Sequence, residues 1–187
     1  VICLWVPLSL SSFGTRRENC IDLLNVEFVQ DELVMDLSLM RGSLGQRLRR
    51  SPVDCTLAIS YSVQILQGLR FLHDIGIIHR DLKPDNILLS EGDCVKICDC
   101  GLSHCVSGAG ARAPLVCTLY YRPPELLMAD AFETHAESTW YGSEVDVWSA
   151  GCIIRELLIG RGGGGVSTGQ VGLLIQKQVG SYAFCHA

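Results

Sequence analysis

The sequence has no excess of positive charge. Its 187 residues include 15 Lys and Arg against 20 Asp and Glu, which gives a formal net charge of −5 at pH 7, and no basic patch dominates. Binding to nucleic acid depends on clustered cations that neutralise phosphates. We therefore expect no nucleic acid among the partners of this chain.

Long apolar runs are also missing. A helix that crosses a bilayer needs about 20 consecutive, mostly apolar residues, and no segment of the sequence reaches that length. Residues 1–10 are apolar, but no basic region precedes them and Pro7 interrupts them, so they do not match a secretory signal. We expect no membrane association, and we interpret the chain as a fragment or an imperfect gene model rather than a secreted protein.

The ten cysteines lack the Cys-x-x-Cys spacing that is common at zinc sites. Three of them lie in apolar stretches, where a free thiol behaves as a small hydrophobic side chain: Cys55, Cys117 and Cys152. A strand would point Cys98 and Cys100 to one face and bury them. We favour buried free thiols, and a zinc site within the cysteine cluster at 94–105 is the alternative.

Hydrophobic residues make up 48% of the chain and charged residues 19%, so one folded domain is expected. The clearest helix prediction covers residues 54–74, with Asp54 as the N-terminal cap and Gly76 beyond the C-terminus. Five residues recur at helical spacing and predict its buried face: Ala58, Tyr61, Ile65, Leu69 and Leu72.

A second helix is predicted from about Ser143 to Leu158. Its predicted inner stripe consists of Val147, Ala150, Gly151, Ile154 and Leu158. Four consecutive glycines at 162–165 follow it as a loop, and they are no phosphate-binding P-loop because Gly-Lys-Ser/Thr does not follow them. Residues 168–179 could begin one more helix.

Shorter segments predict strands and loops. We expect strands at 20–29 and 33–37 with a turn between them, and a hairpin formed by 86–89 and 94–98. Leu44 and Leu48 indicate a short helix. Residues 102–117 are expected to form a loop.

The most informative stretch is residues 79–86, which read His-Arg-Asp-Leu-Lys-Pro-Asp-Asn. Phosphoryl transfer needs a carboxylate near the attacking hydroxyl, a cation near the moving group, and oxygen ligands for Mg²⁺. Asp81, Lys83, Asn86 and Asp99 are the right residue types for these tasks. The alternative is a solvated loop that happens to be rich in Asp, Lys and Asn.

The stretch fits the pattern H-R-D-L-x-x-x-N of the protein-kinase catalytic loop, and Asp99-Cys100-Gly101 begins 13 residues after Asn86. Residues 117–125 and 146–151 resemble the end of the activation segment and the start of the central helix. The chain thus resembles a serine/threonine protein kinase. Lys83 is typical of the serine/threonine loop, and Thr118 with Arg122 matches the cyclin-dependent and mitogen-activated group.

The resemblance implies an α+β fold, a mostly helical large lobe with a remnant of the small-lobe sheet. Residues 16–187 would be a partial kinase domain, with 1–15 unassigned. Its parts would lie as follows: hinge at about 33–40, catalytic loop at 79–86, activation segment at 99–125 and central helix at 143–159.

The resemblance also implies roles for single residues, with ATP and Mg²⁺ as cofactors. Asp81 would orient the substrate hydroxyl, and Lys83 would stabilise the transferring phosphoryl group. Asn86 and Asp99 would hold magnesium. Adenine would lie against the hinge residues Asp36 and Ser38 and above Leu88, with Met35 as gatekeeper. Three supporting residues would shape the loop: buried His79, Arg80 against the activation segment, and Asp146 as an acceptor of backbone N–H groups.

The implied function is proline-directed phosphorylation of Ser/Thr-Pro sites on proteins, with a regulatory protein as a second partner, in the cytoplasm or nucleus. The alternative is an inactive kinase-like fragment that binds proteins. It is motivated by the absence of a Gly-rich loop and a strand lysine, by Cys100 where kinases carry Phe, and by Ala113 about where relatives carry a phosphorylated Thr. A truncated product without a stable fold is a third hypothesis.

Overall fold

The computed structural model describes residues 19–30, 32–105, 111–112, 116–131 and 140–159. Helices are labelled α, 3₁₀ helices η and strands β. In chain order the elements are β1 (Leu23–Val29), β2 (Glu32–Leu37), β3 (Gly42–Ser43), α2 (Leu44–Arg50), α3 (Cys55–Asp74), β4 (Ile77–Ile78), η2 (Pro84–Asn86), β5 (Ile87–Leu89), β6 (Val95–Ile97), η3 (Cys100–Leu102), β7 (His104–Cys105), β8 (Ala111–Arg112), η4 (Leu119–Tyr121), α4 (Pro124–Ala131), β9 (Trp140–Tyr141) and α5 (Glu144–Ile159).

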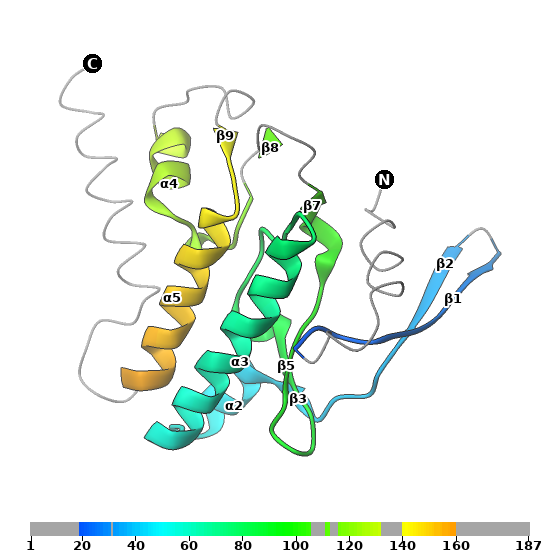
Figure 1. The fold of residues 1–187 in the computed structure, drawn as a ribbon, viewed down its shortest axis with the longest axis horizontal. Coiled ribbons are helices and arrows are strands. Elements are labelled where there is room, and N and C mark those ends of the chain that lie inside the picture. Colours follow the sequence, from blue (N-terminus) through cyan, green and yellow to red (C-terminus); the bar gives the residue numbers. More distant parts are fainter. Residues whose placement is uncertain (1–18, 31, 106–110, 113–115, 132–139, 160–187) are drawn as a thin grey trace.

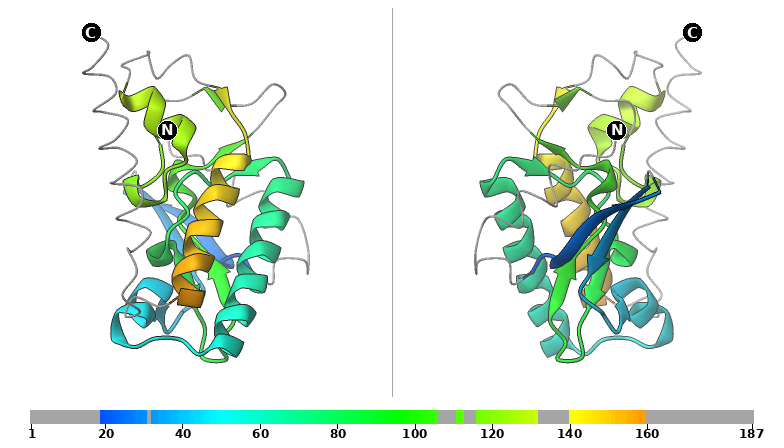
Figure 2. Two further views of the ribbon diagram at one scale, coloured as in Figure 1. Left: turned by 90° about the vertical axis from the view of Figure 1, so that its left-hand side faces the viewer. Right: turned by 90° about the vertical axis from the view of Figure 1, so that its right-hand side faces the viewer.

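Two long helices, α3 and α5, lie side by side (Figures 1 and 2), and the β1–β2 pair lies on the opposite side of α3 from α5 (Figure 1). The sheet that matters for the site is β3-β5-β6, an antiparallel arrangement in which Leu88 pairs with both Ser43 and Lys96. The β5–β6 hairpin was predicted from the sequence. It carries the chain from the loop at 79–86 to Asp99, so the fold brings these two regions together.

Helix α3 agrees with its prediction in bounds, cap and buried face. All five residues of the predicted stripe are buried, with exposed fractions of 0 to 2%. Burying each large apolar side chain stabilises the fold by about 1.5–3 kcal/mol. The side chain of Asp54 accepts the N–H of Leu57 at 3.0 Å, and Gly76 after the helix has a left-handed φ of 75°.

Helix α5 lies where it was expected, but three of the five residues of its predicted inner stripe are exposed, and Ile154 is half-buried. Ala150 is buried, whereas Val147 is 55% exposed, Leu158 is 53% exposed, and Gly151 is exposed as well. The buried face instead mixes apolar with polar residues: Val145, Asp146, Ser149, Ala150, Ile153, Glu156 and Leu157. An apolar-only pattern missed this face because three of its members are polar and hydrogen-bonded inside.

The strands β1 and β2 form an antiparallel hairpin that projects from the helical body (Figure 1). Strand β1 begins at Leu23, three residues after the predicted start. Cys20 instead forms an isolated parallel bridge with Ile97, which joins the start of the hairpin to β6. The predicted loop at 102–117 contains the two-residue strands β7 and β8.

The cysteine prediction is correct in part. Cys98 and Cys117 are buried free thiols, but Cys55 is exposed because it is the first residue of α3. Cys98 and Cys100 do not share a strand, since β6 ends at Ile97. Within the described ranges, no group of three His, Cys, Asp or Glu residues could hold a metal ion.

Several predictions concern parts of the chain outside the described residues. These are the segment 1–15, the four glycines, the helix at 168–179 and Ala113. In the part that the structure describes, no helix has the length and apolarity needed to cross a membrane.

Candidate active site

The loop at 79–86 is shaped by Asp146 at the start of α5. Its Oδ2 accepts the backbone N–H of His79 and its Oδ1 accepts that of Arg80, both at 2.8 Å. Asp146 is fully buried, and His73 Nε2 lies 2.9 Å from the same Oδ2. Arg80 has a left-handed φ of 68°, which costs a residue with a side chain about 1–2 kcal/mol. The two charge-assisted bonds offset this cost, as predicted for Asp146.

The carboxylate of Asp81 accepts four hydrogen bonds from the surrounding loops. Oδ1 accepts from Thr118 Oγ1 at 2.6 Å and from its backbone N–H at 3.1 Å. Oδ2 accepts from Lys83 Nζ at 2.6 Å and from Asn86 Nδ2 at 3.2 Å. The carboxylate is therefore fixed in position, with three of the four predicted catalytic residues in direct contact.

These bonds also set the charge of Asp81. Burial by itself raises the pKa of this carboxyl, but the hydrogen bonds from Lys83 and Thr118 outweigh burial and hold the pKa below its usual range. Asp81 is thus ionised at neutral pH. A carboxylate with a low pKa is a weak proton acceptor, so it is suited to orient a hydroxyl rather than to remove its proton early.

Asp99, the fourth predicted catalytic residue, follows β6 and lies next to the loop at 79–86. Its neighbour Cys98 donates its N–H to the carbonyl of Asn86 at 3.0 Å, and the carbonyl of Cys98 lies 2.9 Å from Nε2 of the buried His79. Asp99 is exposed, has a left-handed φ of 63°, and accepts the N–H of Gly101 at 3.3 Å. The fold therefore places the backbone just before Asp99 beside the loop that carries Asp81.

The chemistry of the donor set fits Mg²⁺. Asn86 uses its Nδ2 atom for its bonds to Asp81, so its amide oxygen lies on the other side of the group. Asp99 offers an exposed carboxylate. Magnesium prefers carboxylate and amide oxygens and usually keeps several waters, so two protein ligands suffice.

The three residues predicted to bind adenine come from two parts of the fold. Leu88 lies on β5, Asp36 lies on β2, and Ser38 follows β2. Leu88 on β5 pairs with Lys96, whose Nζ contacts Asp22 at 3.0 Å, and the carbonyl of Asp22 accepts the N–H of Ser38 at 3.1 Å. Ser38 and Leu88 are therefore linked through one ion pair. Asp36 lies out on the β1–β2 hairpin, where Asn25 is its partner at 3.4 Å.

Ser38 has one further property. Its Oγ atom is buried, and it has no hydrogen-bond partner among the residues that the structure describes. A buried hydroxyl without a partner costs about 1–3 kcal/mol. Such a group is suited to contact a ligand that supplies the missing partner.

Two residues that sequence reasoning did not assign to the site belong to it. Thr118 marked the kinase group in the sequence, but its bonds to Asp81 follow only from the folded chain. Tyr141 gave no signal, and its hydroxyl accepts from Arg80 Nη1 at 2.9 Å. The sequence feature that could have indicated a role for Thr118 is its position four residues before Arg122, which begins the Arg-Pro-Pro-Glu stretch.

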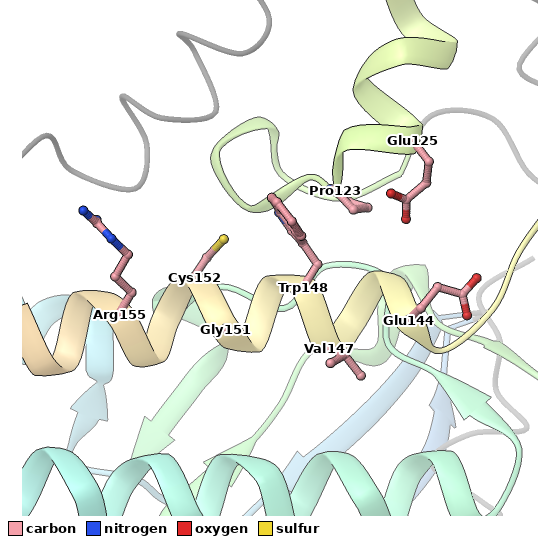
Figure 3. A pocket seen from close by; sticks show the side chains of 8 residues that line it. All are labelled: Pro123, Glu125, Glu144, Val147, Trp148, Gly151, Cys152 and Arg155. Carbon is pink, nitrogen blue, oxygen red and sulfur yellow. The ribbon is translucent and has the colours of Figure 1, made fainter.

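A separate groove of about 850 Å³ lies between α4 and α5 (Figure 3). Trp148 and Cys152 point from α5 toward α4, whereas Glu125 and Glu144 lie at one end and Arg155 at the other. Its lining is Pro123, Glu125, Glu144, Val147, Trp148, Gly151, Cys152 and Arg155. None of the predicted catalytic or nucleotide-binding residues lines this groove, so it is not the candidate active site.

A helical body, a β-hairpin and an Asp-Lys-Asn loop followed by a hairpin that leads to a second aspartate are the arrangement of a protein kinase. The family model described as "Protein kinase domain" matches residues 11–163. The chain belongs to the protein kinase family, and the predicted α+β fold is confirmed.

Individual relatives point to two kinase groups. The chain is 39% identical over 150 residues to mitogen-activated protein kinase mpkC of Aspergillus oryzae, covering 78% of this chain and 40% of that protein. It is 36% identical over 157 residues to cyclin-dependent kinase-like 2 of Oryctolagus cuniculus, covering 78% and 25%. The chain thus spans two-fifths or less of the length of these relatives.

A solved structure shares the fold. A chain in the crystal structure of the yeast RNA Pol II CTD kinase CTDK-1 complex matches with a TM-score of 0.69 and 31% identity. The match covers 81% of this chain and 47% of that chain. The names of the sequence relatives support a serine/threonine and mitogen-activated kinase-like classification, and the solved structure supports the kinase fold.

Proposed function

We propose that this chain is the catalytic part of a protein kinase that transfers the γ-phosphoryl group of ATP to Ser or Thr hydroxyls followed by Pro. The observation that carries the proposal is the Asp81 carboxylate held by Lys83, Asn86 and Thr118. Asp81 accepts the substrate hydroxyl and orients its oxygen toward the phosphoryl group. Positioning and charge neutralisation are the main requirements of this reaction.

Lys83 supplies the cation. An ammonium group has three N–H donors, and two of them point to Asp81 Oδ2 and to Thr118 Oγ1, at 2.6 and 3.3 Å. The third is left for an oxygen of the transferring group. Lys83 is half-buried, which strengthens its electrostatic effect relative to a solvated lysine.

Asn86 and Asp99 would hold Mg²⁺ through their side-chain oxygens. Bound Mg²⁺ neutralises negative charge on the β- and γ-phosphates. The left-handed backbone of Asp99 and its bond to Gly101 orient the carboxylate before ligands arrive. The adenine end would lie against Leu88, with Asp36 near the end of β2 and Ser38 just after that strand.

The preference for proline has its own geometric support. The carbonyl of Cys117 accepts from Arg122 Nε at 3.2 Å and from Nη2 at 3.0 Å, and Cys117 has a left-handed φ of 68°. This carbonyl, one residue before Thr118, is thus turned toward Arg122 rather than toward a bound peptide. A substrate N–H there would stay unpaired at a cost of about 1–3 kcal/mol. Proline has no N–H and avoids the cost.

The test is phosphate transfer from Mg-ATP to a Ser-Pro peptide and to a matched Ser-Ala peptide. We expect Asp81→Asn to lower the rate by about 10² or more, because a small misplacement of the reacting group costs about that much. Asp74→Asn, on the exposed surface of α3, should leave the rate unchanged. Equal rates for the wild type and Asp81→Asn would refute catalysis by this site, and the inactive binding module would then be the better account.

A second arm tests the substrate preference. Arg122→Ala frees the Cys117 carbonyl, so we expect the ratio of Ser-Pro to Ser-Ala rates to fall. An unchanged ratio would refute proline selection by this contact.

We further propose a cytoplasmic or nuclear location, in line with the mitogen-activated and cyclin-dependent-like names of the relatives. A regulatory protein is a second proposed partner, because the solved neighbour comes from a kinase complex.

A further inference from the structure

The side chain of Arg80 joins segments that are far apart in the sequence. Its Nε donates to the carbonyl of Leu102, just after the Asp99-Cys100-Gly101 stretch. Its Nη1 donates to the hydroxyl of Tyr141 at 2.9 Å. Arg80 itself precedes Asp81 directly. A shift of this guanidinium would therefore change the position of Asp81 in the candidate active site.

Tyr141 is well placed to hold that guanidinium still. It is 3% exposed and packs in a buried cluster with Ile78, Val116, Cys117, Leu126 and Val145. Its backbone pairs with Ala111 in the β8–β9 ladder. One residue thus connects the middle of the activation segment, through its backbone, to the catalytic loop, through its hydroxyl.

In the contact between Arg80 and Tyr141, the tyrosine hydroxyl carries no charge. Burial raises the pKa of Tyr141, although the hydrogen bond from Arg80 opposes this rise. The phenol therefore remains protonated at neutral pH. Among the described residues, the hydrogen-bond acceptors of the Arg80 side chain are this hydroxyl and a carbonyl, and it forms no ion pair there. Ala113 lies outside the described residues, and alanine has no hydroxyl that could be phosphorylated.

We propose that Tyr141 is a positioning residue whose hydroxyl fixes the Arg80 guanidinium and so holds the activation segment on the catalytic loop without a phosphate group. The inference rests on the proposed kinase function for its consequence in catalysis. Its structural part, the coupling of Tyr141 to Arg80 and Ala111 and of Arg80 to Leu102, depends only on the contacts given above.

The experiment compares the wild type with Tyr141→Phe, which keeps the ring and removes only the hydroxyl. We expect kcat for a Ser-Pro peptide to fall about tenfold, the effect of one lost hydrogen bond to a charged group. KM for ATP should change less than twofold. Hydrogen exchange in the peptide spanning 102–112 should become faster, and phosphatase treatment should leave the wild-type rate unchanged.

Tyr61→Phe is the matched control, because Tyr61 is also fully buried and its hydroxyl is bonded, to Asp93 at 2.8 Å. It should lower the melting temperature but leave kcat and the exchange of 102–112 as in the wild type. Arg80→Ala with and without Tyr141→Phe completes the test, and we expect the double variant to be no slower than Arg80→Ala alone.

Unchanged kcat and hydrogen exchange in Tyr141→Phe would overturn the inference. It would also be overturned if the loss of kcat in the double variant equalled the product of the losses in Arg80→Ala and Tyr141→Phe. Loss of wild-type activity on phosphatase treatment would overturn the part concerning phosphate. A wild-type chain with no phosphate transfer would instead reject the proposed function, and the exchange data would still decide whether Tyr141 holds the segment.

Discussion

Asp146→Ala is the substitution that most severely tests how the active-site loop is built. The aspartate is fully buried, and its two oxygens accept the backbone N–H groups of His79 and Arg80 at 2.8 Å each. Alanine leaves both donors inside the protein without a partner, and it removes the group beside His73 Nε2.

The magnitude follows from these contacts. Each buried N–H without a partner costs about 1–3 kcal/mol, and bonds to a charged acceptor lie at the upper end. We therefore expect a loss of about 4 kcal/mol in the free energy of unfolding. For a domain of this size, 1 kcal/mol shifts the melting temperature by about 2–4 °C, so the melting temperature should fall by about 10 °C.

A second consequence concerns Arg80. Its left-handed backbone is unfavourable by about 1–2 kcal/mol, and without Asp146 the loop can relax. Asp81 would then leave its contacts with Thr118 and Lys83, so activity should fall even at temperatures where the variant stays folded.

The assay is urea unfolding followed by circular dichroism, with Glu144→Ala as the matched control. Glu144 lies on the same helix but is exposed, and its removal should cost about 1 kcal/mol or less. If Asp146→Ala costs no more than Glu144→Ala, the reasoning about the buried acceptor is refuted.

Two further predictions test the packing and the electrostatics. Val145 and Val147 are matched residues on α5 with 0% and 55% exposure, so Val145→Ala should lower the free energy of unfolding by about 1–2 kcal/mol and Val147→Ala by under about 0.5 kcal/mol; similar losses would contradict the observed inner face. Burial and the hydrogen bond to Asp93 raise the pKa of Tyr61 from 10.0 to about 12. Because the folded pKa is raised, the protonated phenol stabilises the fold fully below pH 10, and this contribution is lost as the pH rises toward 12. The stability difference between the wild type and Tyr61→Phe should therefore shrink across this pH range in urea titrations, and a constant difference would count against the raised pKa.

How much the sequence could predict depended on the kind of residue that each surface buries. Helix α3 buries an apolar stripe, so periodicity gave its face residue by residue. Helix α5 buries Asp146, Ser149 and Glu156 alongside apolar residues. These polar side chains have partners that come from distant segments, and hydrophobic periodicity carries no information about such partners.

The residues of the candidate site also fall into two groups, those that the sequence predicted and those that only the fold shows. The eight residues at 79–86 pointed to Asp81, Lys83 and Asn86, which are close together in the chain and contact one another. Thr118 and Tyr141 reach the site only after the activation segment folds back, over sequence separations of 37 and 61 residues. Such contacts depend on the tertiary fold.

The central claim is that Asn86 and Asp99 meet Asp81 around one magnesium and nucleotide site. The most direct measurement is the melting temperature with and without Mg-ADP for the wild type, Asp99→Asn and the surface control Asp74→Asn. At a ligand concentration of about 100 Kd, binding to the folded chain adds about 2.7 kcal/mol, so we expect a rise of about 5–10 °C in the wild type and the control. The account predicts little or no rise in Asp99→Asn, and a full rise in that variant, or none in the wild type, would contradict it.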